Sequence, residues 1–444
     1  MRIIEKVKNN KFWSAVMQLS FGQVVGQVIN LICVPILSRV YSNDDYGQLG
    51  ILVSTATIIT GFVCLGINSS MMLAESDGDA RKAFHVSHNL QIALAAIVVV
   101  VLFLISRFRT IINIDIPIVY ALIIIFLYIS FNARNTLLSI YLNRIGLNKI
   151  LLLSPIINAC ANLLIALPLG LLKLRFYGLI ASAIIAFLVS NIVMSHYAKM
   201  GFKHCTFNDY KCVIKKYSNL VKFQYPSNLV TSLSTQTPNQ ILSSQFGNNS
   251  LGSYSMCDKV FHIPFTMIAT PIQTIYFRTA SKMSDRIDML SDFTYSMVSK
   301  ILCVAAVPVL ITVFFGKEIF SFVLGSDWSQ AGEWASFLIL MYVFSFVNNC
   351  ITYCRVSIGK AKINLFTSIG NLVIVLISIV IGAFLIKSLQ TTIVAFSIAS
   401  TIFGALNIYI TFRCMGRNHN KFLLLSVLYI AMGALANFVK WVLL

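Results

Sequence analysis

The sequence predicts an all-α polytopic membrane protein, and three observations support this fold class. Hydrophobic residues make up 57% of the 444 residues and charged residues only 11%, whereas about a quarter of a soluble protein is charged. The apolar residues form long runs of about 20, the length that a membrane-spanning helix needs. These runs do not alternate with polar residues, as the strands of a β-barrel would. The composition therefore excludes a soluble enzyme, a disordered chain and a nucleic-acid-binding domain.

The apolar runs predict twelve core spans in two lobes of six. Those of the first lobe are Ser14–Ser38, Gln48–Ser70, His88–Ser106, Pro117–Tyr141, Ile150–Leu172 and Tyr177–His196. Those of the second are Gln224–Phe246, Tyr254–Phe277, Phe293–Phe315, Trp334–Cys354, Ile363–Ile386 and Leu389–Phe412. We expect an N-terminal lobe over 1–196, a basic cytoplasmic linker over 197–223, a C-terminal lobe over 224–421, and an apolar segment over 422–444 that can form a thirteenth span.

The basic residues predict the orientation of the spans. The net charge is +19, from 34 Lys and Arg against 15 Asp and Glu. With the N-terminus inside, 23 of the basic residues fall in inner segments and 8 in outer ones, as the positive-inside rule requires. We therefore expect a cytoplasmic N-terminus and no nucleic-acid partner. The ten cysteines show no CxxC pair, so neither a metal site nor a disulfide framework is expected.

An internal repeat is visible between the two lobes. A shift of 205 aligns Ile36-Leu37-Ser38 with Ile241-Leu242-Ser243, and a shift of 213 aligns Asn135 with Asn348 and Gly146 with Gly359. Both lobes begin inside, so the repeat is parallel, with its axis along the membrane normal.

Polar side chains form a stripe on the first span and on the seventh. Spacings of three and four residues place each set on one helix face. The two stripes are Ser20, Gln23, Gln27 and Asn30, and Asn228, Ser232, Thr235 and Asn239. Such groups face other helices or water, because lipid leaves them without hydrogen bonds. They either bond neighbouring helices together or line a wet cavity between the lobes, and their duplication favours the cavity.

Ionisable residues within spans are costly and point to function. Asp258, Lys259 and His262 lie in the eighth span and Arg134 in the fourth, while Arg39 ends the first. We interpret Arg134 and Lys259 as bases that bind an anionic substrate. Asp258 and His262, four residues apart on one face, are the candidates for ion coupling. A structural ion pair is the alternative. No HExxH, GxSxG or P-loop motif occurs, so the chain is not expected to be an enzyme or to hold a cofactor.

Two stretches resemble a known family. They are Gly22-Gln23 … Pro35-Ile36-Leu37-Ser38-Arg39-Val40-Tyr41 … Tyr46-Gly47, and Phe315-Gly316 followed by Leu324-Gly325-Ser326-Asp327-Trp328-Ser329-Gln330-Ala331-Gly332-Glu333-Trp334. Both are similar to polysaccharide transporters of the multidrug/oligosaccharidyl-lipid/polysaccharide (MOP) superfamily, in particular Wzx-type O-antigen flippases.

The resemblance implies a MATE-like pair of six-helix lobes that alternates between the faces of the bacterial inner membrane. It implies that O-antigen or other polysaccharide repeat units, linked to undecaprenyl diphosphate, move from the cytoplasmic to the periplasmic face with ion coupling. Arg134, Lys259, Gln23, Gln27, Asn30, Asn228, Ser232 and Arg39 are then the expected cavity residues. Membrane lipids and the polymerase and chain-length proteins of the same pathway are the expected partners.

Two other functions remain open from the sequence. A multidrug cation antiporter of the same fold would favour acidic cavity residues, whereas Asp258 is the only acid placed well inside a span. A membrane-embedded polysaccharide polymerase or transferase usually needs a long outer loop or an embedded catalytic histidine or acid. All outer connections predicted here are short, which favours the flippase.

Overall fold

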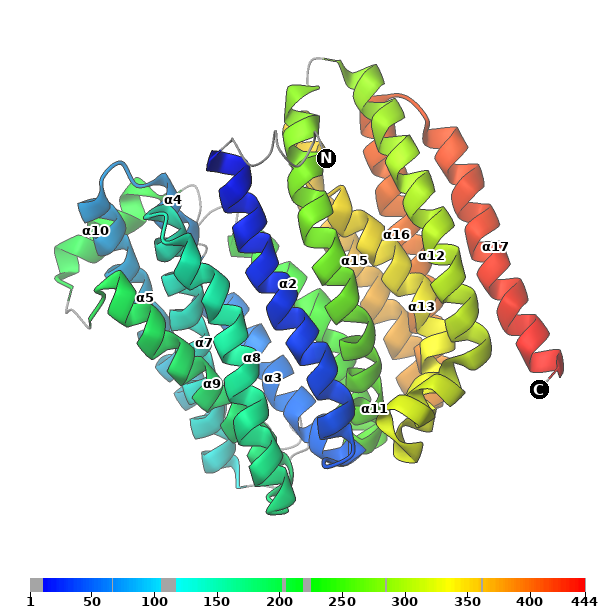
Figure 1. Cartoon of the computed structure of the whole chain (residues 1–444), viewed down its shortest axis with the longest axis horizontal. Coiled ribbons are helices and arrows are strands. Elements are labelled where there is room, and N and C mark those ends of the chain that lie inside the picture. The colour runs from blue at the N-terminus through cyan, green and yellow to red at the C-terminus, as the bar shows by residue number, and fades with distance from the viewer. Residues whose placement is uncertain are drawn as a thin grey trace. The chain divides into compact units, whose positions relative to one another are not determined.

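The computed structural model describes residues 11–65, 67–104, 117–201, 205–218, 225–283, 286–360 and 362–443. These residues form helices joined by short connections, and no strand occurs among them (Figure 1). The all-α class predicted from the sequence is therefore confirmed. Ten helical segments of the described residues are long and apolar enough to cross a membrane, so the chain is a multi-pass membrane protein.

The chain divides into two compact units, Met1–Leu251 and Gly252–Leu444, called unit 1 and unit 2. Unit 1 contains α2 (Lys11–Ser38), α3 (Asn43–Val63), η1 (Ile67–Ser69), α4 (Ser70–Leu73), α5 (Asp77–Leu104), α7 (Ile118–Arg144), α8 (Asn148–Leu171), α9 (Arg175–Ala198), α10 (Phe207–Lys216) and the first part of α11 (Tyr225–Lys282). Unit 2 contains the rest of α11, then α12 (Ile287–Leu324), η3 (Ser326–Trp328), α13 (Ser329–Cys350), α14 (Cys354–Ser357), α15 (Lys362–Val380), η4 (Ile381–Ile386), α16 (Leu389–Met415) and α17 (His419–Leu443).

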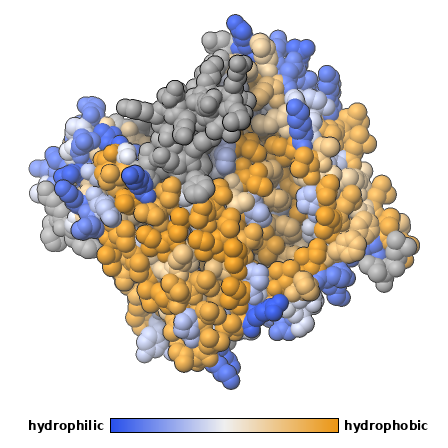
Figure 2. All heavy atoms as spheres, in the orientation of Figure 1, coloured by the Kyte–Doolittle hydropathy of each residue, from blue (hydrophilic) through white to orange (hydrophobic). Residues whose placement is uncertain are grey.

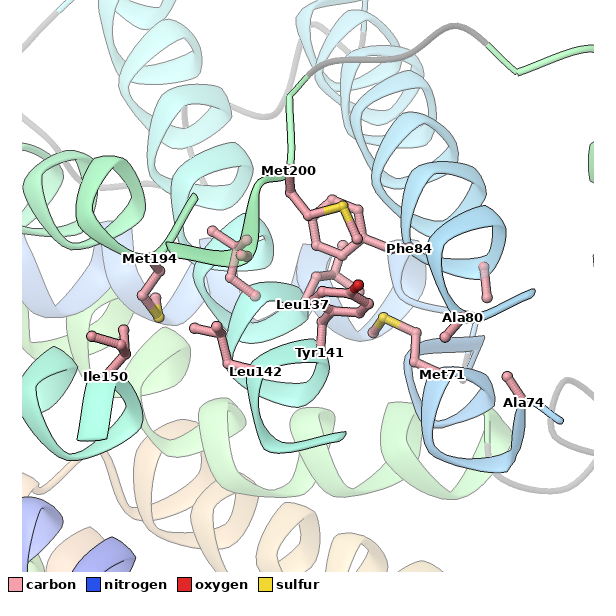
Figure 3. Packing of buried hydrophobic residues seen from close by; sticks show 13 residues of the cluster. Met71, Ala74, Ala80, Phe84, Leu137, Tyr141, Leu142, Ile150, Met194 and Met200 are labelled. Atoms are coloured by element: carbon pink, nitrogen blue, oxygen red, sulfur yellow. The ribbon is translucent and has the colours of Figure 1, made fainter. Parts of the chain in front are cut away.

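The long helices of unit 1 pack as neighbours in the order α2, α8, α9, α7, α5, and α3 contacts α5, α7 and α9. At one end of the unit, α4, α5, α7 and the segment after α9 share a cluster of buried apolar side chains (Figure 3). Phe84, Tyr141 and Met200 belong to this cluster. The cluster anchors Met200 and so fixes the chain directly after α9.

A serine cap explains the tight connection between α2 and α3. The Ser42 hydroxyl accepts a hydrogen bond from the Asp45 amide, and the Asp45 carboxylate accepts one from the Ser42 amide. This capping box satisfies two amide groups that the first turn would otherwise leave unpaired. The neighbouring Tyr41 is buried and donates its hydroxyl proton to the Ala166 carbonyl, 2.6 Å away on α8. The turn is thereby held against the unit.

α11 combines the predicted seventh and eighth spans in one element. Its single non-helical residue is Gly247, with φ 82° and ψ 170°, a conformation that glycine reaches without steric cost. Close to this kink, the Ser243 hydroxyl donates to Asn248 Oδ1 at 2.8 Å. α11 is not among the segments apolar enough to be counted as spans, because both of its halves carry many polar residues.

In unit 2, α12 packs on α13 and α17, while α16 packs on α13 and α15. The backbones of α12 and α13 approach closely at Gly316 and Gly332. A Cβ at Gly316 would lie only 2.7 Å from the Gly332 carbonyl oxygen. α17 is itself apolar enough to cross a membrane, as expected for a thirteenth span.

The predicted repeat has counterparts in corresponding helices of the two units. Asn135 of α7 donates to Ser190 of α9 at 3.0 Å, and Asn348 of α13 donates to the Gly404 carbonyl of α16 at 2.9 Å. These elements are the predicted spans four and six of one lobe and ten and twelve of the other. Gly146 and Gly359, which follow α7 and α14, also share a φ of 73°.

Candidate functional site

The first candidate site is an ionisable cluster on the second part of α11, in unit 2. Asp258 and Lys259 are half-buried there, and His262 is exposed one turn further along. Asp258 accepts a hydrogen bond from the Tyr342 hydroxyl of α13 at 2.9 Å. A charge-assisted hydrogen bond of this kind fixes the direction of the carboxylate. The cluster thus presents an acid, a base and an imidazole within five consecutive positions.

Aromatic side chains surround the acid of this cluster. Phe261 and Tyr342 have ring centroids 5.1 Å apart, and Phe265 stacks on Phe346 at 5.3 Å. Tyr254, one turn before Asp258, is buried. This packing fixes the face of α11 that meets α13, so Asp258 lies at the edge of a rigid aromatic contact.

Arg134, the predicted base of the fourth span, is 8% exposed in unit 1. Its Nη1 lies 3.0 Å from His88 Nε2 of α5. Its Nη2 donates to the Ser195 hydroxyl of α9 at 3.1 Å and to the Met200 carbonyl at 3.2 Å. One guanidinium therefore joins α5, α7 and the end of α9. Sequence reasoning identified Arg134 but not His88, which it placed at the boundary of a span.

The polar stripe of α2 is only partly described. The side chain of Gln23 lies outside the described residues, while those of Gln27 and Asn30 are half-buried. Arg39 is exposed immediately after α2.

The polar stripe of α11 has two different surroundings. Asn228 and Thr235 are exposed, whereas Ser232 is half-buried. The Ser232 hydroxyl oxygen would lie 3.0 Å from a Cβ at Gly61 of α3, so this serine packs closely against that helix. Part of the stripe is therefore solvent- or lipid-exposed, and part contacts α3.

A polar contact between α3 and α11 was not predicted from the sequence. Gln240 donates to the hydroxyls of Ser54 and Thr55 at 3.2 and 3.0 Å. The Ser54 hydroxyl in turn donates to the Gln236 carbonyl at 3.3 Å. The adjacent hydroxyl residues Ser54 and Thr55 inside an apolar run could have indicated this contact from the sequence.

A second buried arginine was also missed, because it follows α13 in what the sequence suggested was a cytoplasmic segment. Arg355 is 6% exposed. It donates to the Thr367 hydroxyl at 3.1 Å and to Asn407 Oδ1. Each unit thus has a buried guanidinium that joins several helices by hydrogen bonds.

The linker helix α10 is tied to the first turn of α5 by charge. Lys216 lies 3.3 Å from Asp79 and 3.4 Å from Glu75. The hydrogen bond to Asp79, aided by that to Glu75, holds the pKa of Lys216 above its ordinary value. On the same side of α10, Val213 and the following Tyr217 pack against Val86 and Ile67. This basic helix is therefore a packed part of unit 1.

Among the described residues, no group of three or more His, Cys, Asp or Glu side chains is arranged to hold a metal ion. Figure 2 shows apolar side chains over much of the visible faces of the helices, with hydrophilic ones collected near their ends. The ionisable side chains within the spans are therefore the main candidates for a functional site, because a charge inside a membrane is costly.

The fold is shared with transporters of the MOP superfamily. An inward closed structure of the lipid II flippase MurJ matches with a TM-score of 0.69 and 14% identity, over 96% of this chain and 98% of that one. An inward-facing multidrug resistance MATE transporter matches with a TM-score of 0.65 and 13% identity, over 92% and 99%. A MOP superfamily transporter from Pyrococcus furiosus matches with a TM-score of 0.58 and 12% identity, over 91% and 96%.

Sequence comparison identifies the family. The model of a family described as polysaccharide biosynthesis proteins matches residues 36–333, which is more than half of the chain. The chain therefore belongs to this family of polysaccharide biosynthesis proteins. No curated protein sequence matches it.

Proposed function

We propose that the protein is a flippase for lipid-linked polysaccharide units. Its cargo is an O-antigen or other polysaccharide repeat unit on undecaprenyl diphosphate, moved from the cytoplasmic to the periplasmic face of the bacterial inner membrane. Membership of the polysaccharide biosynthesis family and a fold shared with the lipid II flippase MurJ support the proposal. So does the positive-inside distribution of charge, which favours a cytoplasmic N-terminus.

The sugar part of the cargo needs a polar path through the membrane, which a transporter that opens to each side in turn can provide. Each sugar hydroxyl costs several kcal/mol to move unpaired into hydrocarbon, so an oligosaccharide does not cross a bilayer without a polar path. The exposed polar face of α11, with Asn228 and Thr235, offers hydrogen-bonding groups along such a path. We propose that Gln23, Gln27 and Asn30 of α2, with Arg39 at its end, contribute to the same path, and that Ser232 borders it.

The observation that carries the proposal is the cluster of Asp258, Lys259 and His262 on α11. Its acid accepts a hydrogen bond from Tyr342, which packs on Phe261. We propose that Lys259 binds the cargo diphosphate, because an ammonium group attracts phosphate oxygens strongly. Asp258, aided by His262, then carries the coupling proton. Phosphate bound at Lys259 changes the field at the adjacent Asp258, which links cargo binding to proton binding. The sequence also suggested Arg134 for the cargo phosphate, but its guanidinium is held by His88, Ser195 and the Met200 carbonyl of unit 1, and in this proposal Lys259 alone binds the diphosphate.

Two variants separate these roles. Lys259→Gln is expected to reduce export of the lipid-linked unit at least tenfold, while Asp258→Asn is expected to remove the dependence of export on the proton gradient. Asparagine still accepts the Tyr342 hydrogen bond, so Asp258→Asn changes charge without removing that contact. The matched control is Lys300→Gln, at an exposed lysine of α12 in the same unit.

The assay is complementation of a flippase-null strain, with the sidedness of the accumulated lipid-linked units as readout. Units that face the cytoplasm in the Lys259→Gln strain, with normal protein level, support the proposal. Normal export by both Lys259→Gln and Asp258→Asn overturns the assigned roles.

The same strain distinguishes the other functions. The fold shared with a multidrug resistance MATE transporter makes a cation antiporter the second candidate, and it predicts drug resistance without complementation. Accumulation of unpolymerised units that already face the periplasm in a deletion strain of this protein indicates a polymerase or transferase.

A further inference from the structure

Unit 1 contains a cavity of about 640 Å³ between α7, α9 and the three residues that follow α9. Cationic or titratable side chains line one part of it, namely Arg134, His196 and Lys199. Leu188 and Ile192 line the other part. The volume is in the range of small-molecule sites, about 300–1,000 Å³, and neither the ionisable cluster of α11 nor the polar stripe of α11 contributes to it.

We propose that this cavity binds an anionic phospholipid of the surrounding bilayer, with the phosphate near Arg134 and Lys199 and an acyl chain along Leu188 and Ile192. Binding of a bilayer lipid here does not depend on the identity of the transported cargo.

Along α9 the cavity wall changes from apolar to cationic, which matches the acyl chain and the phosphate of a phospholipid. Leu188 and Ile192 lie two and one turns before His196, so the apolar and cationic parts are separated by about 6–12 Å along the helix axis. Ile192 is 61% exposed, so the apolar part opens on the outer surface of the unit. With the N-terminus inside, the cationic end lies at the cytoplasmic leaflet, whose anionic lipids attract Lys and Arg side chains.

Arg134 and the backbone of the cationic end are held in place before any ligand binds. Arg134 is held by His88, Ser195 and the Met200 carbonyl. The backbone amides of Lys199 and Met200 donate to the His196 and Ser195 carbonyls and so close the last turn of α9, with Met200 itself anchored in the apolar cluster (Figure 3). A site that is already ordered loses little conformational entropy on binding.

Lys199 adds a second positive charge at a helix end where one cation already interacts with the last carbonyl groups. The C-terminus of α9 attracts cations through its dipole, and Arg134 already occupies this position with its bond to the Met200 carbonyl. None of the ion pairs among the described residues involves Lys199. The two positive charges of Arg134 and Lys199 at one helix end exceed the partial negative charge of the dipole, about half an elementary charge, and favour an anion.

An amide deeper in the wall indicates that water accompanies the headgroup. Asn191 is 3% exposed, and its Nδ2 donates to the Phe131 carbonyl at 2.8 Å. Its Oδ1 has no hydrogen-bond partner among the described residues, and buried acceptors are normally paired with protein or ordered water. Water in the cavity can bond this oxygen and keep the phosphate partly hydrated.

The test compares lipid binding by the purified full chain and by Lys199→Asn. Asparagine tolerates the left-handed backbone of this position, where φ is 51°, better than most residues do. Lys211→Asn, at an exposed lysine of α10, is the matched control. Native mass spectrometry measures the bound fraction of phosphatidylglycerol, with phosphatidylcholine, inorganic phosphate and undecaprenyl diphosphate as the other probes.

We expect the wild type to prefer phosphatidylglycerol to phosphatidylcholine. Lys199→Asn should weaken phosphatidylglycerol binding about fivefold, the effect of one lysine at an anionic membrane surface, while Lys211→Asn and Lys199→Arg bind as the wild type does. Equal binding of the two phospholipids overturns the proposal, and so does an equal loss in the Lys211→Asn control. Displacement of phosphatidylglycerol by equimolar inorganic phosphate or undecaprenyl diphosphate overturns it too, because the cavity then serves free phosphate or cargo.

Discussion

The Arg134 guanidinium lies 3.0 Å from the Nε2 atom of His88, and this contact fixes the tautomer of the histidine. A guanidinium can only donate hydrogen bonds, so Nε2 must accept and the imidazole proton must lie on Nδ1. A neutral ring in this tautomer joins α5 to α7 and contacts Phe84 of the buried cluster. The pair is therefore a structural element of unit 1, and its arginine also lines the cationic cavity.

Substitution of His88 tests this arrangement. His88→Gln retains a side-chain acceptor for Arg134, whereas His88→Leu removes it. Because a hydrogen bond to a charged group contributes about 1.5–3 kcal/mol, we expect His88→Leu to lower the unfolding free energy by about that amount and His88→Gln by less. Thermal unfolding of the purified protein in detergent measures the difference. Equal stability of the two variants would show that the contact contributes nothing.

The sequence located Arg134 but not its three partners. A charge inside an apolar run is visible without a structure, because burial of a charge is costly wherever it occurs. Its partners His88, Ser195 and Met200 are 46, 61 and 66 positions away along the chain. Only tertiary packing brings them together.

The two family-like stretches have structural roles that explain their residue types. Trp328, Ala331 and Trp334 are buried where α12 meets α13, and Gly316 and Gly332 allow the two backbones to touch. Tyr41 ties the first turn of unit 1 to α8. The motifs therefore identified the fold correctly, although their described contacts are packing contacts within each unit.

Gly332→Ala tests the close approach of α12 and α13. A Cβ at this position would lie 2.8 Å from the Cα of Lys317, a backbone atom that cannot move without shifting α12. We expect overpacking to cost about 1–3 kcal/mol, measured as a lower yield of monodisperse protein and a lower melting temperature. Gly78→Ala is the control, because the nearest atom to its Cβ would be 3.7 Å away. Similar stability of the two variants would argue against a tight contact.

Hydropathy predicted the helices of the chain more accurately than their ends. The third span was expected to begin at His88, but α5 begins at Asp77, because the acidic residues of its first turn favour a helix N-terminus although they are too polar for a membrane. The second span was expected to continue to Ser70, but α3 ends at Val63. Leu65, two residues later, has a positive φ of 44°. Hydropathy does not detect such a backbone turn.

The break in α11 does not fall at a proline. Pro226, Pro238, Pro264 and Pro271 all lie within helical stretches of α11. The non-helical residue of α11 is Gly247. Membrane helices tolerate proline because neighbouring groups satisfy the freed carbonyls.

Two adjacent positions of α11 test whether its polar face is wet. Thr235 is exposed and Ser234 is 3% exposed, so cysteines at the two positions lie at nearly the same depth but in different surroundings. On a background without native cysteines, Thr235→Cys and Asn228→Cys should react with a small water-soluble maleimide at least tenfold faster than Ser234→Cys. Labelling of Thr235→Cys by lipid-soluble reagents alone would show that this face meets lipid, and the polar path would then lie elsewhere.

The orientation of the chain is testable at α10, which carries a native cysteine on its exposed side. Cys212 is exposed, and α10 follows α9 in the basic segment that the charge distribution assigns to the cytoplasm. In a variant that keeps only Cys212, we expect a membrane-impermeant maleimide to label inside-out vesicles fully and intact spheroplasts hardly at all. A cysteine introduced at exposed Lys387, on the predicted outer side, is the control and should give the opposite pattern. Because α10 is tied to α5 through Lys216, Asp79 and Glu75, its sidedness also fixes that of the first turn of α5. Labelling of Cys212 from the outside would reverse every span and contradict the proposed direction of transport.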